Sequence, residues 1–245
     1  MGFLNNKKAF KNWYFLYLAR YGLIRSEFIL ETTTRSRIIV RPWTEDVRIA
    51  KSIFSKKNYM NKFVSISPNS VVVDVGANIG AFTIFASQWA KKIYSFEPVS
   101  DNFRALCANI KLNDIRIATP FQMAITSKKG KRNFYIAERE HSGSHSFLLQ
   151  QYDKAIEVET LSVADLLENE SLKRINFLKL DCEGSEIEII EGLSLETAKQ
   201  IEQIAMEFHG RNDYSQEDMV RRLKMLGFHV GLGEKEGYIY CRREL

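Results

Sequence analysis

The distribution of hydrophobic positions along the chain predicts alternating strands and helices. Short apolar runs rich in β-branched residues lie at 71–75, 93–98 and 175–180, and helix-forming stretches follow them at 81–90, 101–112 and 185–191. Runs of this kind are typical of strands buried on both faces of a parallel sheet. The pattern adds strands at 115–118, 121–125, 133–137, 156–161 and 201–208, and helices at 163–167 and 216–226. The protein is therefore predicted to have an α/β fold.

Two patterns of turn and cap residues refine the ends of these elements. The runs at 228–232 and 238–242 flank a turn with glycines at both ends, which predicts a hairpin that closes the sheet with an antiparallel edge. Ser100 precedes the predicted helix 101–112, and Thr44 is the first residue of the one at 44–54, so each is expected to be an N-cap.

The first 62 residues have a pattern of their own. Two short strands are predicted at 28–34 and 37–40, ahead of the helix at 44–54. Residues 1–25 are rich in aromatic residues, carry Lys and Arg and contain no acid, and their longest apolar run, 13–19, is too short to span a bilayer. A helix here either docks on the rest of the protein or lies in the interface of an anionic membrane.

Length and cysteine content indicate the class of protein. A chain of 245 residues with 45% hydrophobic residues suits one α/β domain, taken as residues 63–245, with residues 1–62 as an extension. The three cysteines are scattered and lack Cys-x-x-Cys spacing, so neither a disulfide framework nor a zinc site is expected. A reducing, cytoplasmic location is the natural expectation.

The net charge of +5 is unevenly distributed. Residues 1–62 contain 13 Lys or Arg against 4 Asp or Glu, whereas residues 63–245 contain 22 against 26. The second region also lacks a stripe of interleaved basic and aromatic residues, so no nucleic-acid partner is expected. The basic extension instead allows peripheral contact with the inner membrane surface through residues 1–25.

The turn after the first core strand predicts the cofactor. Asp74, Gly76, Asn78 and Gly80 form an Asp-x-Gly-x-Asn-x-Gly pattern, in which Asn78 replaces the second glycine that a dinucleotide pyrophosphate requires. S-adenosylmethionine has a ribose but no phosphate, and the carboxylate of Asp74 would complement its positive charge. The turn therefore favours S-adenosylmethionine over a nicotinamide cofactor.

The next two strands complete the predicted cofactor site. Glu97 ends the strand at 93–98, about 20 residues beyond the glycines, where an acid accepts hydrogen bonds from ribose hydroxyls. The strand after it is expected to place Met123 and Ala124 near the adenine.

Acids and a histidine end the later strands. Asp181 and Glu183 follow the strand at 175–180, and Glu207 and His209 lie at the end of the strand at 201–208. Ligands bind at the carboxyl ends of strands in open α/β sheets, so these four residues are the catalytic candidates. Two roles stay open: His209 as a general base, or a divalent ion such as Mg²⁺ held by Asp181, Glu207 and His209.

The stretch 138–146 interrupts the regular order. It contains His141 and His145, whose spacing of four would suit a metal on a helix, but Gly143 and the neighbouring serines make a polar loop the expected structure. A loop over the active site that influences substrate specificity is the preferred interpretation.

Taken together, these motifs resemble the FkbM family of S-adenosylmethionine-dependent methyltransferases. The resemblance extends from about residue 71 to 242 and rests on Val-Asp-Val-Gly-Ala-Asn-Ile-Gly at 73–80, Phe-Glu-Pro at 96–98, Phe-Leu-Lys-Leu-Asp-Cys-Glu-Gly-Ser-Glu at 177–186 and Glu-Phe-His at 207–209. Cys182 departs from the aliphatic residue expected there. The resemblance implies a Rossmann-like, seven-stranded, mostly parallel sheet with an antiparallel last strand.

The resemblance also implies a function, namely O-methylation of a hydroxyl on a sugar, glycan, glycolipid or related metabolite. The acceptor would then be a small molecule or glycan. Two alternatives stay open: a nicotinamide-dependent oxidoreductase on a similar sheet, and a catalytically idle, membrane-associated binding protein. Neither the acceptor nor the oligomeric state follows from the sequence.

Overall fold

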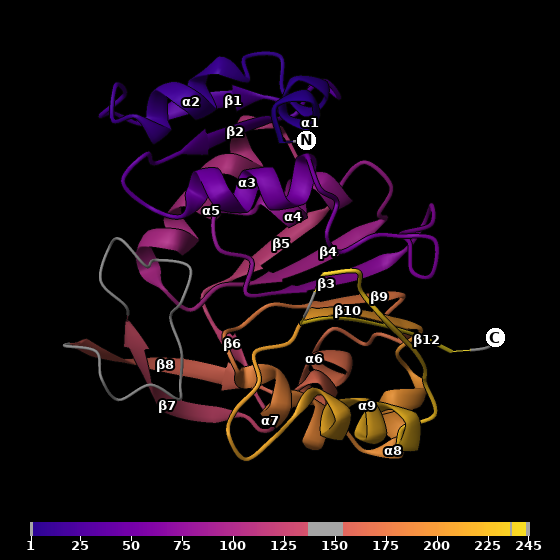
Figure 1. Ribbon diagram of the computed structural model, residues 1–245. Helices are drawn as coiled ribbons and strands as arrows, with labels where there is room; N and C mark the ends of the chain where they lie inside the picture. Colours follow the sequence, from indigo (N-terminus) through magenta and orange to yellow (C-terminus); the bar gives the residue numbers. More distant parts are fainter. Residues whose placement is uncertain (1, 137–153, 236, 244–245) are drawn as a thin grey trace.

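A seven-stranded sheet forms the centre of the molecule, as the computed structural model shows for residues 2–136, 154–235 and 237–243 (Figure 1). The strands run in the order β11-β12-β10-β9-β3-β4-β5. Their bounds are β3 Val71–Val75, β4 Lys92–Phe96, β5 Ala118–Phe121, β9 Phe177–Leu180, β10 Gln203–Glu207, β11 His229–Leu232 and β12 Tyr238–Arg242. All neighbouring pairs are parallel except those that involve β12. The predicted Rossmann-like sheet with an antiparallel last strand is confirmed.

Helices cover both faces of this sheet. Figure 1 shows α3, α4 and α5 on one face and α6 to α9 on the other. Their bounds are α3 Asp46–Phe54, α4 Ala81–Ala86, α5 Ser100–Leu112, α6 Val163–Asn169, α7 Ser185–Glu191, α8 Leu195–Lys199 and α9 Gln216–Met225. Alternate residues of one strand serve the two cores, since Val73 and Val75 belong to one hydrophobic cluster and Val72 to the other. Burial on both faces explains the continuous apolar runs of these strands.

A second, smaller sheet flanks the first. It contains β6 Ala124–Ile125, β7 Gly130–Ile136 and β8 Lys154–Leu161 in the order β6-β8-β7. The prediction of strands at 115–118 and 121–125 was therefore wrong in the bounds of the strands, and it did not foresee that residues 124–125 belong to a second sheet. Strand β5, at the edge of the seven-stranded sheet, begins only at Ala118, and Ala124 and Ile125 pair with β8 instead. The loop at 138–146, with His141 and His145, lies outside the described residues.

Several further boundaries, and the order of the strands in the C-terminal hairpin, differ from the sequence prediction. The helix predicted at 81–90 ends at Ala86. Helix α3 has Glu45 at its N-cap, and Thr44 accepts only a 3.3 Å hydrogen bond from the Asp46 amide. Helix α5 includes Ser100, because the backbone leaves the extended conformation at Val99. In the C-terminal hairpin the antiparallel strand β12 lies inside the sheet, and β11 forms the edge.

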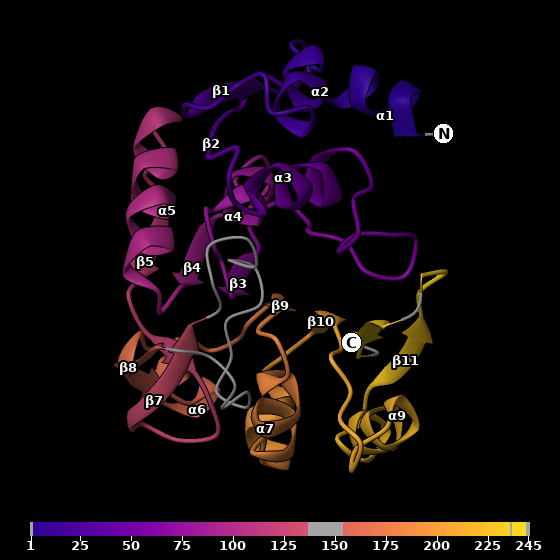
Figure 2. The same ribbon diagram turned by 60° about the vertical axis from the view of Figure 1, so that its left-hand side comes forward.

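The first part of the N-terminal extension, residues 2–40, packs on the outer side of α5 and of α3, which belongs to the same extension (Figure 2). It contains α1 Gly2–Ala9, α2 Tyr14–Arg20 and the antiparallel pair β1 Phe28–Glu31 and β2 Arg37–Val40. Phe10 is fully buried, with its ring centroid 6.0 Å from that of Phe54, and Leu16 is buried in the same cluster. The structure thus shows the docked arrangement for this segment. In the described part of the chain, no helix has the length and apolar character needed to cross a membrane.

Candidate functional site

A pocket opens at the carboxyl ends of β3, β4, β9 and β10. Most of the site residues predicted from the sequence line this pocket, namely Gly76, Asn78, Glu97, Ala124, Asp181, Glu183, Glu207 and His209. In the folded protein, cofactor candidates and catalytic candidates from the sequence analysis therefore line the same pocket.

Three predicted residues do not line the pocket. Asp74 is fully buried beneath the turn, where its carboxylate accepts a 2.8 Å hydrogen bond from Thr83 and lies 3.1 Å from the Lys179 ammonium. Gly80 is the N-cap of α4, and a Cβ there would lie 2.6 Å from Leu106. Met123 packs against the hydrophobic core. These three residues therefore support the residues of the pocket wall and are not part of the wall themselves.

The glycines of the β3–α4 turn are required by close packing. Gly76 has φ of 71°, and a Cβ there would lie only 1.8 Å from the carbonyl oxygen of Asp181. Asn78 has φ of 50°, a left-handed conformation that asparagine tolerates better than most residues. The β3 turn and the β9 turn therefore meet backbone to backbone.

The amide donors of this turn are already used within the protein. The amides of Gly76 and Ala77 donate to the Phe96 carbonyl at 3.0 and 2.9 Å, and the Asn78 amide donates to Glu97 Oε2 at 2.9 Å. A pyrophosphate cradle needs such amides to point at the ligand. The turn consequently does not offer a dinucleotide phosphate site.

Glu97 is nearly buried and doubly anchored. Besides Asn78, the Val99 amide donates to its Oε1 at 2.9 Å. Burial raises the pKa of Glu97 to about 7, although these backbone hydrogen bonds and the Lys179 charge act in the opposite direction. Each carboxylate oxygen has a second lone pair, so Glu97 can still accept hydrogen bonds from a ribose.

Asn102 and Ser185 present polar atoms in the pocket wall. The side-chain oxygen of Asn102 accepts a 2.8 Å hydrogen bond from Arg41, and this contact fixes the orientation of the amide. The side chain of Asn102 also interacts with the Glu97 carboxylate and acts to lower its pKa. The hydroxyl of Ser185 is buried without a hydrogen-bond partner among the described residues. Buried polar atoms are normally satisfied, so Ser185 indicates a ligand that fills the pocket.

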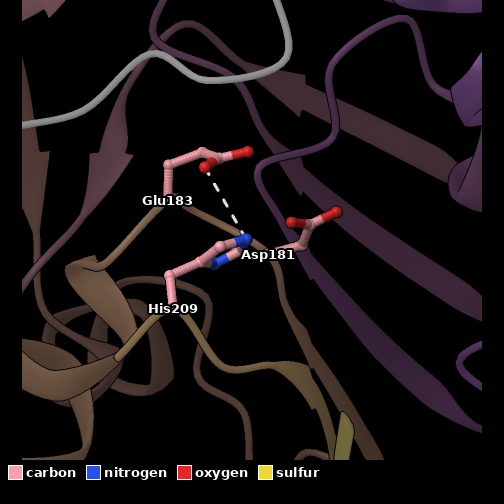
Figure 3. A group of neighbouring side chains, drawn as sticks. All are labelled: Asp181, Glu183 and His209. Atoms are coloured by element: carbon pink, nitrogen blue, oxygen red, sulfur yellow. Dashed lines mark ion pairs between the residues drawn. The ribbon is translucent and has the colours of Figure 1, made fainter. Parts of the chain in front are cut away.

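The acidic turn after β9 faces the end of β10 (Figure 3). Asp181 and Glu183 come from the turn and His209 from the segment after β10, and the three residues offer ligand atoms that all lie within 4.8 Å of one another. His209 Nε2 lies 3.6 Å from Glu183 Oε2. The metal set expected from the sequence contained Asp181 and His209 but named Glu207 in place of Glu183.

Glu207 has other partners. Its Oε2 accepts hydrogen bonds from the hydroxyls of Tyr238 and Tyr59, the latter at 3.1 Å, and Lys235 lies 3.2 Å from its Oε1. The Tyr59 hydroxyl also lies 2.7 Å from Asp181 Oδ2. Glu207 therefore helps to position Tyr59 and is not part of the cluster in Figure 3.

The protonation of His209 follows from its surroundings. Burial alone would lower its pKa, but the hydrogen bond and charge of Glu186 and the charges of Glu183 and Asp181 raise it to about 10. Burial raises the pKa of Glu183 to about 7, against the opposing charge of His209. At neutral pH the imidazole thus carries a proton on both nitrogens, which argues against its role as a general base.

Several site residues were missed by the sequence analysis. Lys179 is buried in β9, and its ammonium donates to the carbonyls of Val75 at 3.1 Å and Gly76 at 2.8 Å. A lysine within a buried strand was the available signal. Arg48 and Tyr59 come from the extension, and no motif marked them.

Glu186 is the last residue of the motif at 177–186, and the sequence analysis predicted no role for it. It is fully buried in α7, and its carboxylate accepts hydrogen bonds from the amides of Cys182 and Gly184. Because Glu186 also contacts His209, it joins the acidic turn to the end of β10.

Cys182 also lines the pocket. Burial and the neighbouring Glu186 raise the pKa of its thiol well above the usual value. The thiol therefore stays protonated at neutral pH and is a poor nucleophile.

Comparison with known proteins agrees with this geometry. The model of the methyltransferase FkbM domain matches residues 74–240. The 31-O-demethyl-FK506 methyltransferase FkbM of Streptomyces tacrolimicus is 28% identical over 211 residues, which make up 74% of this chain and 80% of that protein. The hexuronic acid methyltransferase AglP of Haloferax volcanii is 22% identical over 227 residues, covering 91% of this chain and 92% of that protein.

A solved structure shows the same fold. The methyltransferase FkbM of Methylobacillus flagellatus has a TM-score of 0.51 and 15% sequence identity to this chain, and the match covers 73% of this chain and 44% of that one. The match of the domain model over well over half of the chain identifies the family. The chain belongs to the FkbM family of S-adenosylmethionine-dependent methyltransferases.

Proposed function

We propose that this protein is an O-methyltransferase that acts on a hydroxyl of a sugar, glycan, glycolipid or related metabolite. The supporting observation is the cluster of Asp181, Glu183 and His209 in the pocket whose wall also contains Glu97. Polar and charged side chains of this kind suit an acceptor with hydroxyl groups. The activities that the relatives' names print, on demethyl-FK506 and on a hexuronic acid, are compatible with such acceptors.

The lining of the pocket fits S-adenosylmethionine, which supplies an electrophilic methyl group on a sulfonium when it is bound. Glu97 would accept hydrogen bonds from the ribose hydroxyls, and Asn102 Nδ2 would donate to an acceptor atom of the cofactor. Ala124 and Ile125 provide an apolar wall for the adenine. Asp74 acts indirectly, because it fixes Lys179 against the turn that contacts the cofactor.

The acidic turn after β9 would remove the proton from the acceptor hydroxyl. Asp181 and Glu183 line the pocket as carboxyl groups, and the raised pKa of Glu183, about 7, suits a proton acceptor near neutral pH. Without a bound cation, His209 carries a proton on both nitrogens and would position Glu183 by charge. We expect Glu183→Gln to lower kcat by roughly 100-fold or more, in the range of general-base removal.

The product of O-methylation of a hydroxyl is a methyl ether, whereas methylation of a carboxyl group gives a methyl ester. A hexuronic acid offers both hydroxyl and carboxyl oxygens, so the acceptor panel should include uronic acids, neutral sugars and sugar nucleotides with radiolabelled S-adenosylmethionine. A methyl ether survives mild alkali, whereas a methyl ester is hydrolysed. Alkali-stable label in the product supports O-methylation of a hydroxyl. Alkali-labile label would contradict it, and cofactor binding with no transfer to any acceptor would favour the catalytically idle alternative.

We also propose that the extension makes peripheral contact with an anionic membrane from the cytoplasmic side. Tyr21 and Leu23 are 73% and 71% exposed at the end of α2, next to the basic Arg20. Deletion of residues 1–25 is a poor test, because Phe10 and Leu16 belong to the core. The double variant Tyr21→Ser/Leu23→Ser should sediment less with anionic liposomes than the unchanged protein. Equal sedimentation would contradict membrane contact through this segment.

A further inference from the structure

We propose that Asp181, Glu183 and His209 bind one divalent cation, which holds the acceptor oxygen in the pocket. Glu183 would bind through one carboxylate oxygen and keep the other to accept the hydroxyl proton. The assignment of the role rests on the proposed function, whereas the site rests on its geometry. The three ligand atoms lie within 4.8 Å of one another, and His209 Nε2 is already 3.6 Å from Glu183 Oε2. Neighbouring ligands of a six-coordinate ion lie about 3 Å apart, so small side-chain movements would complete the site.

Glu186 orients His209 for this role. Its carboxylate is fully buried, and Oε1 lies 3.3 Å from His209 Nδ1. Backbone amides of Cys182 and Gly184 hold the same carboxylate at 2.6 and 2.8 Å. A histidine that binds a metal typically donates its other ring nitrogen to a carboxylate, which fixes the ring and the tautomer. With Nδ1 directed to Glu186, Nε2 faces the two other ligands (Figure 3), and it would release its proton to solvent when the cation binds.

A second observation points to a ligand at this end of the pocket. The Ser185 hydroxyl is in the pocket wall next to the acidic turn, and Ser185 is 3% exposed. Its Oγ has no hydrogen-bond partner within the described residues. A hydroxyl buried in a polar pocket normally meets a partner, and the water shell of a cation or the acceptor itself would supply one.

The partners of the neighbouring acids define the ligand set. Tyr59 and Lys179 approach Asp181 through Oδ2, at 2.7 and 3.8 Å, so Oδ1 is the oxygen available to a cation. Glu207 is engaged by Tyr59, Tyr238 and Lys235 and would stay outside the coordination sphere. Two carboxylate oxygens and one imidazole nitrogen suit Mn²⁺ or Mg²⁺ and leave coordination positions for the acceptor oxygen and water.

Binding of Mn²⁺ to the full chain tests the site directly. Mn²⁺ is titrated without cofactor, and the free ion is followed by electron paramagnetic resonance alongside calorimetry. We expect one Mn²⁺ per chain, competed by Mg²⁺, and at least about tenfold weaker binding to Glu183→Gln and to His209→Ala. His229→Ala on β11 and Glu196→Gln on α8 remove the same functional groups at exposed positions, and both variants should bind like the unchanged protein.

Glu186→Gln tests the positioning role separately. Loss of a carboxylate that orients a metal-binding histidine typically weakens metal affinity about 10- to 100-fold. The thermal unfolding midpoint of each variant is measured as well, so that loss of binding in a folded variant is separated from loss of the fold.

Two outcomes would overturn the metal site: no Mn²⁺ binding by the unchanged chain with or without S-adenosylhomocysteine, or binding that Glu183→Gln and His209→Ala leave intact. A parallel titration with S-adenosylhomocysteine separates this proposal from the proposed function. Binding of S-adenosylhomocysteine without Mn²⁺ contradicts the metal site alone. Binding of Mn²⁺ without S-adenosylhomocysteine contradicts the proposed function alone.

Discussion

Single residues of the β3–α4 turn have structural and functional roles that coincide. Gly76 lets the turn touch the backbone at Asp181, and Asn78 directs its amide to Glu97. Because Glu97 also accepts from the Val99 amide, one carboxylate joins the ends of β3 and β4. The residues expected to bind the cofactor are therefore also those that hold the pocket in shape.

Gly76→Ala should destabilise the protein because the new Cβ would lie 1.8 Å from the Asp181 carbonyl oxygen. The strained φ and the enforced backbone shift together are expected to cost about 3 kcal/mol or more, measured by urea unfolding. Gly22→Ala is the matched control, since Gly22 has φ of 68° with nothing near its Cβ position. Its cost should stay near about 1 kcal/mol. Equal costs at the two positions would contradict the close packing of the turns.

The raised pKa of Glu97 predicts a pH dependence of cofactor binding. Hydrogen bonds from ribose hydroxyls favour the ionised carboxylate, so the bound state has a lower pKa than the free value of about 7. Affinity for S-adenosylhomocysteine should then fall as the pH drops below about 7, by up to roughly tenfold per pH unit. Calorimetry between about pH 8 and 6 measures this fall.

The control for this prediction is Glu97→Gln, which keeps the side-chain shape but does not titrate. Its affinity should be lower than that of the unchanged protein in mild alkali and should lack the component of pH dependence caused by Glu97. The same pH profile in the variant and the unchanged protein would remove Glu97 from the ribose site.

At the scale of elements, β3 and β9 are linked by a buried ion pair. Lys179 and Asp74 are opposite each other in the parallel register, and they are 3% and 0% exposed. The ammonium also donates to two carbonyls at the end of β3. This pair fixes the relative positions of the two turns that form the pocket.

Lys179→Met should leave the Asp74 charge buried without its cation and cost about 3–5 kcal/mol of unfolding free energy, measured by urea denaturation. The double variant Asp74→Asn/Lys179→Met removes both charges. Its new amide oxygen can still accept the hydrogen bond from Thr83, so part of the cost should be recovered. A single variant with near-normal stability, or no recovery in the double variant, would contradict the importance of the pair.

The elements that the sequence predicted well are those with one dominant local signal. Strands β3, β4 and β9 are continuous apolar runs, and the turns after β3 and β9 carry recognisable glycines and acids. The antiparallel hairpin was expected, but its order in the sheet was not, because hydrophobic pattern does not state which strand pairs with β10. Likewise the assignment of Ala124 and Ile125 to a second sheet depends on pairing with β8, which is distant in sequence.

The parts of the site that escaped prediction depend on long-range contacts. Tyr59 lies 122 residues from Asp181 in the sequence, and only the fold brings its hydroxyl to that carboxylate. Glu183 takes the place expected for Glu207 in the acidic cluster for the same reason, since side chains of the C-terminal hairpin engage Glu207. Asp74 was placed correctly on its strand, but its buried partner Lys179 was not foreseen.

At the scale of the whole molecule, the extension and the sheet form the pocket together. Arg48 of α3 and the core strands line the same pocket, and Tyr59 bridges Asp181 and Glu207 from the segment after α3. The basic extension therefore contributes residues to the pocket, in addition to the exposed surface for which membrane contact is proposed. This arrangement supports a methyltransferase in which residues 1–62 contribute to acceptor binding, which we put forward as a proposal.

Binding of S-adenosylmethionine in the pocket underlies every role proposed for these residues. Calorimetric titration of the full chain with S-adenosylhomocysteine measures it, with NAD in a parallel titration. We predict one S-adenosylhomocysteine per chain, weakened binding in Glu97→Gln and no binding of NAD. Binding of NAD, or no binding of S-adenosylhomocysteine by the folded protein, would contradict the assignment of the pocket.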